Sequence, residues 1–268
     1  MEKIHFDYKM TIKYSEFTRL CYFSFKCIPM DTKRQKLLKY RINIEPSVQV
    51  SNCTDSFGNR KLYGTIKGLH SYMEYDIEGE AEIDQILYEA EVDKESLGMY
   101  KFPYGKNKSG KNIEGFYKKI ISLEDFADVK TDYEKAIYIM KQLHKTFEYE
   151  KGVTSIETDA EEAFSLQKGV CQDYAHIYIA LLHLANIPAR YVTGMMIGEG
   201  ESHAWVEFVW REKWIGVDPT NNLLIDNNYI KLANGRDALD CEINRGIIFG
   251  GGEQTLTTSV RVWKEENK

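Results

Sequence analysis

The sequence predicts an α+β protein in which antiparallel β structure precedes a domain of mixed helices and strands. The first residues, up to roughly position 90, alternate apolar and polar side chains without helical spacing. Helical spacing with capping signals follows, and strand-like segments return from Arg190 onward. The chain has 268 residues, which allows one or two domains at roughly 150 residues each. We therefore expect a β-sandwich over residues 1–100, a linker over 101–115 and a second domain over 116–268.

The N-terminal strands are predicted from alternation with a period of two. Apolar residues occupy every even position from Ile4 to Tyr14, which places them on one face of an extended chain. The same alternation recurs over residues 38–44 and 73–83, and residues 55–59 carry a turn signal between them. Several short strands separated by turns favour a small antiparallel sandwich.

The segment 103–112 is polar, contains glycine and lacks periodicity, so it is the best candidate for a domain boundary. Part of it resembles a phosphate-binding loop. However, Asn112 stands where that loop needs serine or threonine, and Pro103 precedes it in place of a strand. We interpret the segment as a solvated linker.

Three helices are predicted in the second half of the chain. A capping box at residues 131–134 precedes an apolar stripe with helical spacing. A second capping box at residues 158–161 precedes a short helix, and a third helix extends from Cys171 to about Asn186. Strands are then predicted over residues 189–193, 202–210, 214–217 and 255–263.

Composition and charge exclude several classes of partner. The 35 basic and 41 acidic residues give a net charge of −6 without a basic block, which argues against nucleic acid or an anionic membrane. No apolar segment approaches the roughly 18 residues of a membrane span. The five cysteines lack C-x-x-C spacing, and the N-terminus lacks the apolar stretch of a signal peptide. We expect a soluble cytoplasmic protein without metal or cofactor, either monomeric or dimeric.

The strongest chemical signal is Gly-Val-Cys-Gln-Asp-Tyr-Ala-His at residues 169–176. It places Cys171 in the first turn of a predicted helix, where the helix dipole and unpaired N–H groups favour the nucleophilic thiolate. Gly169 would let the chain turn sharply and let a substrate backbone approach. Asp173 is expected to serve the helix start and to point away from the sulfur. Cys171 alone would favour an inert buried cysteine, so other residues must decide the interpretation.

His203 and Asp218 lie on two segments that predict an antiparallel hairpin. If Trp210 pairs with Lys213, then Trp205 lies opposite Asp218, and His203 shares their face. Diagonal neighbours lie roughly 7–8 Å apart at the backbone, within reach of an imidazole and a carboxylate. The carboxylate would fix the imidazole tautomer, and the other ring nitrogen would take the thiol proton.

Together these motifs resemble the bacterial transglutaminase-like superfamily in their order and spacing. The first 90 or so residues are similar to the β-sandwich that often precedes this catalytic domain in bacteria. The resemblance implies a papain-like core in which Cys171 is the nucleophile, His203 the base and Asp218 the orienting acid. It rests on residues 169–176, 187–192, 202–207 and 217–221.

The resemblance also implies thioester chemistry on a peptide or side-chain amide. The family includes cross-linking transglutaminases, amidases and proteases, and the same triad serves all of them. We expect hydrolysis, because water is always present and amine transfer needs a second binding site. Transamidation and a non-catalytic binding module on the same fold are the alternatives. No segment matches the calcium-binding segments of animal transglutaminases, so the resemblance gives no reason to expect calcium.

Two further residues are candidates for the site. Gln167 lies four residues before Cys171 and could add a side-chain amide to an oxyanion-binding site. Trp205, on the face of His203, could form a wall of the cleft. The alternatives are an ordinary polar role in a helix or loop for Gln167 and a core position for Trp205.

Overall fold

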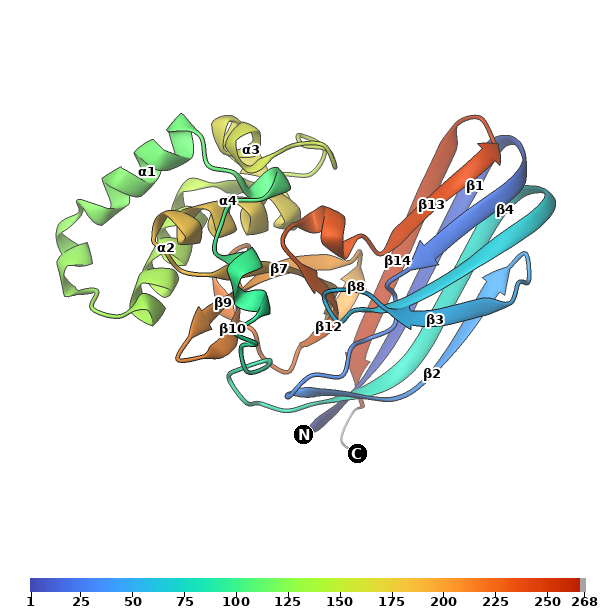
Figure 1. Cartoon of the computed structure of the whole chain (residues 1–268), viewed down its shortest axis with the longest axis horizontal. Coiled ribbons are helices and arrows are strands. Elements are labelled where there is room, and N and C mark those ends of the chain that lie inside the picture. The colour runs from blue at the N-terminus through green and yellow to red at the C-terminus, as the bar shows by residue number, and fades with distance from the viewer. Residues whose placement is uncertain (266–268) are drawn as a thin grey trace.

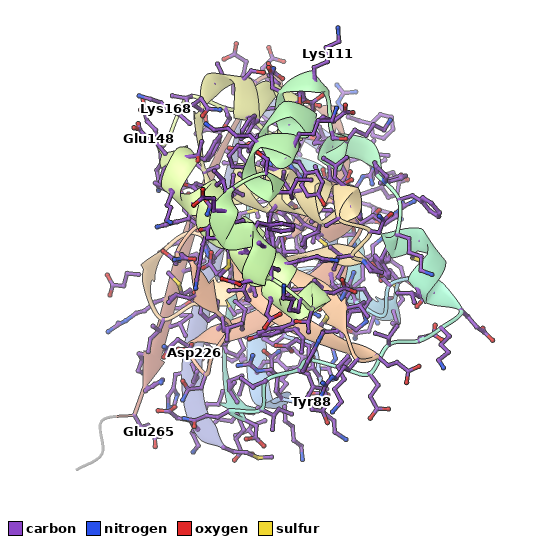
Figure 2. All side chains as sticks on the ribbon, turned by 90° about the vertical axis from the view of Figure 1, so that its left-hand side faces the viewer. Tyr88, Lys111, Glu148, Lys168, Asp226 and Glu265 are labelled. Atoms are coloured by element: carbon purple, nitrogen blue, oxygen red, sulfur yellow. The ribbon has the colours of Figure 1, made fainter. Side chains whose placement is uncertain are left out.

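The structure is a computed structural model that describes residues 1–265. Two antiparallel sheets lie face to face, and the helices cover the outer face of the smaller sheet (Figure 1). The core between the sheets joins residues such as Phe6 and Ile77 of the first sheet to Met195 and Ile230 of the second. Seen from the helix side, Lys111 and Glu265 lie at opposite ends of the molecule (Figure 2).

The first sheet takes its strands from both ends of the chain. Its order is β2-β4-β1-β14-β8, with β3 beside β4 and β13 beside β1. The strands are β1 (Glu2–Phe25), β2 (Gln35–Glu45), β3 (Val50–Thr54), β4 (Arg60–Ile83), β8 (Gly198–Gly200), β13 (Asn244–Gly250) and β14 (Gln254–Lys264).

The predicted alternation in β1 is confirmed. Every even residue from Ile4 to Tyr14 is buried, whereas the odd residues between them are exposed or half-buried. β4 pairs along most of β1, from Glu2 opposite Ile83 to Phe25 opposite Leu62. The inward face of this long ribbon carries the apolar side chains that meet the second sheet.

The predicted fold class, antiparallel β structure before an α+β domain, is confirmed. In detail, the N-terminal strands form one hydrogen-bonded sheet, and the sandwich arises where that sheet packs on the second sheet. The domain boundaries differ from the prediction at the end of the chain. β13 and β14 were expected within the domain at 116–268, but they pair with β1. β1 lies inside the sheet and so needs a paired strand on each side. β4 pairs along one side of β1, and β13 and β14 pair along the other.

The second sheet has the order β11-β10-β9-β7-β12. A separate parallel pair, β5 (Glu148–Tyr149) and β6 (Lys168–Gly169), brings Glu148 beside Lys168 (Figure 2). The strands of the second sheet are β7 (Ala189–Met196), β9 (His203–Trp210), β10 (Lys213–Asp218), β11 (Leu223–Leu224) and β12 (Tyr229–Gly235).

The longer helices of the second domain agree with the sequence signals. The predicted capping box opens α2, where Thr131 accepts a hydrogen bond from the N–H of Glu134. α3 begins one residue later than predicted, because the side chain of Asp159 caps it and Thr158 accepts from Ser155 instead. No helix within residues 1–265 is long and apolar enough to cross a membrane. The α-helices are α1 (Lys111–Ile121), α2 (Asp132–Thr146), α3 (Ala160–Leu166) and α4 (Cys171–Leu184).

The predicted linker at 101–115 is fixed to the second domain. Lys106 and Asn107 are buried against the second domain, and α1 begins at Lys111, inside the predicted linker. The Asn107 side chain donates to the carbonyl of Arg236 at 2.7 Å, and the N–H of Lys106 donates to Asp237 at 3.2 Å. Lys106 and Asn107 therefore serve internal hydrogen bonds, whereas most of the segment around them is exposed, as expected of a solvated linker.

Candidate active site

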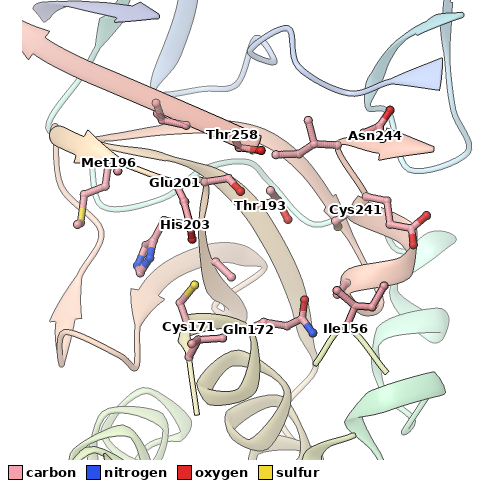
Figure 3. Close-up of a pocket in the computed structure, with 18 of the residues that line it drawn as sticks. Ile156, Cys171, Gln172, Thr193, Met196, Glu201, His203, Cys241, Asn244 and Thr258 are labelled. Atoms are coloured by element: carbon pink, nitrogen blue, oxygen red, sulfur yellow. The ribbon is translucent and has the colours of Figure 1, made fainter. Parts of the chain in front are cut away.

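A cleft of about 920 Å³ lies between the first sheet and the second domain. Cys171 and His203 face each other at its base (Figure 3). The opposite wall comes from the inward faces of β1 and β14, so both sheets shape the cleft. The residues of that wall are Tyr8, Met10, Leu256, Thr258 and Val260.

Cys171 is the first residue of α4, as the sequence predicts, and its free thiol is partly exposed. Asp173 fixes this helix start by accepting the N–H of Val170 and the hydroxyl of Thr154, each at 2.7 Å. The expectation that Asp173 serves the helix start is thereby met. Burial raises the pKa of the Asp173 carboxyl, although these two hydrogen bonds oppose that rise.

Gly169 has a different role from the one expected. A Cβ at this position would lie 2.4 Å from Oδ2 of Asp173, and Gly169 does not line the cleft. The glycine therefore leaves room for the carboxylate that caps α4, and its place outside the cleft lining gives no support to a contact with the substrate backbone.

The hairpin has the predicted register. Trp210 pairs with Lys213, and Val206 pairs with Val217. In this register Nε2 of His203 lies 2.7 Å from Oδ2 of Asp218. The carboxylate is completely buried, whereas the imidazole keeps one side toward the cleft.

Asp218 binds His203, as the sequence predicts, and also caps the turn that follows β10. Its Oδ1 accepts the backbone N–H groups of Thr220 and Asn221 at 2.9 and 3.1 Å, which caps the turn after β10. Its Oδ2 accepts from His203, from Nδ2 of Asn221 at 2.8 Å and from the hydroxyl of Tyr229 at 2.9 Å. Burial would raise the pKa of Asp218, but these hydrogen bonds and the charge of His203 hold it below its usual value.

The surroundings of His203 favour the imidazolium. Burial alone would lower the pKa of the ring, but hydrogen bonds to Asp218 and Cys171, together with the negative charges of both, raise it to about 10. Since Nε2 is engaged with Asp218, Nδ1 is the ring nitrogen left for proton exchange with Cys171. The start of α4 and a protonated His203 both place positive charge near the Cys171 sulfur, which suits a nucleophile.

Comparison with known proteins gives matches to two family models. The transglutaminase-like superfamily matches residues 123–219, and the bacterial transglutaminase-like N-terminal region matches residues 4–82. These two stretches of the chain thus match a transglutaminase-like core and the N-terminal region that accompanies it in bacteria. The core match spans Cys171, His203 and Asp218.

Three known proteins show how far the similarity of this chain extends in sequence and in fold. An uncharacterized protein of Mycobacterium tuberculosis is 25% identical over 258 residues, covering 85% of this chain and 82% of its own. The crystal structure of a "putative cysteine protease" from Cytophaga hutchinsonii superposes with a TM-score of 0.80 at 21% identity, covering 100% and 92%, and shows the same fold. A protein-glutamine gamma-glutamyltransferase of Pseudomonas aeruginosa is 34% identical over 70 residues, or 21% of this chain and 10% of that protein.

The structure places the two other candidate residues of this chain outside the cleft. Gln167 ends α3 with a left-handed φ of 58°, and its side-chain amide turns back to the carbonyl of Phe164. Trp205 is 1% exposed and packs in a small core cluster with Tyr229. The structure thus agrees with the alternative interpretations of both residues, since Gln167 ends a helix and Trp205 fills the core.

Tyr229 is a site residue that the sequence analysis missed. Its hydroxyl shares Oδ2 of Asp218 with His203, and its ring centroid lies 6.1 Å from that of His203. The ring also contacts Trp205 edge-on at 5.5 Å. An aromatic residue at the start of a buried strand is an ordinary core pattern, so no local motif indicates this role.

The first turn of α4 provides donors that could bind an oxyanion. The first N–H groups of a helix have no acceptor within the helix, and here they belong to Cys171 and Gln172 in the cleft. Within residues 1–265, no group of three or more His, Cys, Asp or Glu side chains could hold a metal ion.

We expect Cys171 to be alkylated by iodoacetamide much faster than the other cysteines at pH 6. The pKa of His203 is raised to about 10, so its ring is protonated at this pH, and a positive charge beside a sulfur at a helix start favours its reaction as a nucleophile. Cys21, Cys27 and Cys241 are buried with raised pKa values, and Cys53 is the exposed reference. Peptide mapping by mass spectrometry gives each rate. Equal rates for Cys171 and Cys53 at pH 6 would contradict the role of Cys171 as the nucleophile.

Proposed function

We propose that this protein is a thiol-dependent acyl-transfer enzyme that attacks an amide carbonyl of a peptide or protein and passes the acyl group to water. The 2.7 Å bond between His203 and Asp218, in a cleft that also holds Cys171, is the observation that carries this proposal. The match to the transglutaminase-like superfamily supports it.

The geometry supports a two-step reaction. The Cys171 thiolate attacks the carbonyl carbon, and the N–H groups at the start of α4 bind the oxyanion. The His203 imidazolium gives its Nδ1 proton to the leaving nitrogen, which departs as an amine or ammonia and leaves a thioester. Neutral His203 then takes a proton from water, whose oxygen attacks the thioester, and the acid product leaves the Cys171 thiolate. Asp218 holds the ring in one orientation throughout.

Transfer to an amine is the second candidate. The local similarity to a protein-glutamine gamma-glutamyltransferase favours it, and the same thioester would be its intermediate. We favour water as the acceptor, because water needs no binding site of its own. A non-catalytic binding module is less well supported, since His203 is hydrogen-bonded to Asp218 and lines the same cleft as Cys171, a grouping that binding alone does not need.

We further infer that the enzyme acts in the cytoplasm. All five cysteines are free, which suits a reducing compartment.

The function is tested by trapping the acyl-enzyme. The protein is mixed with a peptide library, quenched in acid within milliseconds to seconds, and analysed by intact-mass and peptide mass spectrometry. We expect an acyl adduct on Cys171 and the free acid as the released product, even when a primary amine is present. Release of the amide of that amine would favour the transamidase. No adduct from any peptide, with Cys171 still alkylated by iodoacetamide, would favour the binding module.

A further inference from the structure

The short strand β8 lies directly before His203 and belongs to the first sheet. It pairs with β14, with Gly200 opposite Val260 and Gly198 opposite Val262. Within residues 1–265, β14 is its only strand partner, so β8 is an edge of that sheet. An edge strand leaves alternate backbone N–H and C=O groups without a sheet partner. All three residues of β8 are exposed, and all three line the cleft.

The pairing shows which way a side chain at Gly200 would point. Directly opposed residues of antiparallel strands share a face of the sheet. Val260 lines the cleft, so the vacant Cβ position of Gly200 is on the cleft face as well. Glu199 has the opposite orientation, because its carboxylate lies 3.4 Å from Nε of Arg261. The cleft face of β8 therefore consists of bare backbone.

No contact among residues 1–265 requires glycine at position 200. A Cβ there would have no atom within 4 Å, and its φ lies outside the left-handed region. Gly194 is a useful contrast, because a Cβ at that position would lie 2.3 Å from the ring of Trp205. Glycine within a strand often marks a place where another backbone approaches closely. At Gly200 no atom of residues 1–265 fills this space, so the position is open to a chain from outside the molecule.

We propose that β8 is the main-chain recognition strand of the cleft, along which an extended polypeptide lies backbone to backbone. The substrate class is thus an unfolded or extended peptide segment, whose backbone pairs with the edge of β8 and whose side chains occupy the space that Gly200 leaves open on the cleft face. Since His203 follows Gly200 by only three residues and shares the cleft with Cys171, such a segment presents its amide to the thiolate. The inference rests on the proposed function, because it assigns the substrate of the same site.

The test compares Gly200→Val with a matched control, Gly115→Val. Gly115 is exposed in α1, and a Cβ there also meets no atom within 4 Å. Three alkylating probes are used: iodoacetamide, a tetra-alanine chloromethyl ketone, and a tetra-alanine analogue with the chloromethyl ketone on a central side chain. The two peptide probes cover a main-chain and a side-chain amide. The second-order rate of Cys171 modification is measured for each variant, with the melting temperature as a check of folding.

We expect Gly200→Val to lower the rate with the better peptide probe by roughly tenfold or more, which is the loss of about one good contact. The iodoacetamide rate and the melting temperature should not change, and Gly115→Val should behave like the wild type. Methylation of one backbone nitrogen of the peptide probe should lower the rate of Cys171 modification by a similar factor in the wild type. In Gly200→Val the same methylation should lower the rate little further.

An unchanged peptide rate in Gly200→Val, or no sensitivity to backbone methylation at any position, would overturn the role of β8. A wild-type protein that reacts with neither peptide probe faster than with iodoacetamide would also overturn it. Failure of the proposed function is read in a separate experiment, the acyl-enzyme trapping, in which no peptide of the library would then give an acyl adduct on Cys171.

Discussion

Replacing Cys171 by alanine should abolish the acyl-enzyme and lower turnover by on the order of 10⁶-fold, since the reaction loses its only nucleophile. Alanine suits the first position of a helix, and the Cys171 side chain is only partly buried, so the fold should be retained. The substitution should also lower the pKa of His203 from about 10, because the ring loses the hydrogen bond and the charge of the thiolate. Single-turnover acylation and an NMR titration of the imidazole measure the two effects.

Cys53→Ala is the control for this substitution. Cys53 is exposed on β3 and lies outside the cleft, so its removal should change neither the acylation rate nor the titration of His203. An acyl adduct that persists in Cys171→Ala would show that another side chain is the nucleophile. A His203 pKa that does not move would show that the thiolate and the imidazolium are not paired.

Replacing Asp218 by asparagine should slow acylation by about 10³- to 10⁴-fold, a loss known for such a change in a catalytic triad. The asparagine oxygen can still accept the two backbone N–H groups of the turn, as Oδ1 of Asp218 does. Its amide nitrogen would then face three donors: Nε2 of His203, Nδ2 of Asn221 and the hydroxyl of Tyr229. His203 can avoid this conflict by moving its proton to Nδ1, and the ring then has no free base for the Cys171 thiol.

The same variant should also be less stable, because Oδ2 of Asp218 is buried and accepts three hydrogen bonds. Thermal melting and single-turnover acylation of the folded fraction separate the two effects. Near-wild-type acylation per folded molecule would remove Asp218 from the chemistry and restrict it to capping the turn. Loss of acylation with an unchanged melting temperature would assign it to orienting His203 alone.

The site could be predicted from the sequence because its parts are local. The hairpin that joins His203 to Asp218 has a tight turn, and the period of two fixes which residues share a face once Trp210 pairs with Lys213. The position of Cys171 likewise follows from the start of one helix. Each of these inferences needs only a few neighbouring residues and a regular geometry.

The parts that could not be predicted depend on contacts between distant segments. The alternation in residues 255–263 indicates a strand but carries no information about its partner, and its pairing with β1 is set by the whole fold. The burial of Lys106 is equally non-local, since its backbone partner is Asp237. Gln167 shows a different limit. Its spacing from Cys171 suggests an oxyanion donor, but the left-handed backbone that ends α3 decides where its side-chain amide points.

The position of β14 between β1 and β8 has a consequence for folding during translation. Ser15 and Glu253, which are hydrogen-bonded where the β1–β14 ladder ends, are 238 positions apart in the chain. The ribosome adds about 5–20 residues per second, so β14 is synthesised roughly ten to fifty seconds after β1. β8 cannot attach to its sheet until the same moment, because β14 is the strand it pairs with. A nascent chain that has not reached β14 thus carries Cys171 with no complete wall opposite it.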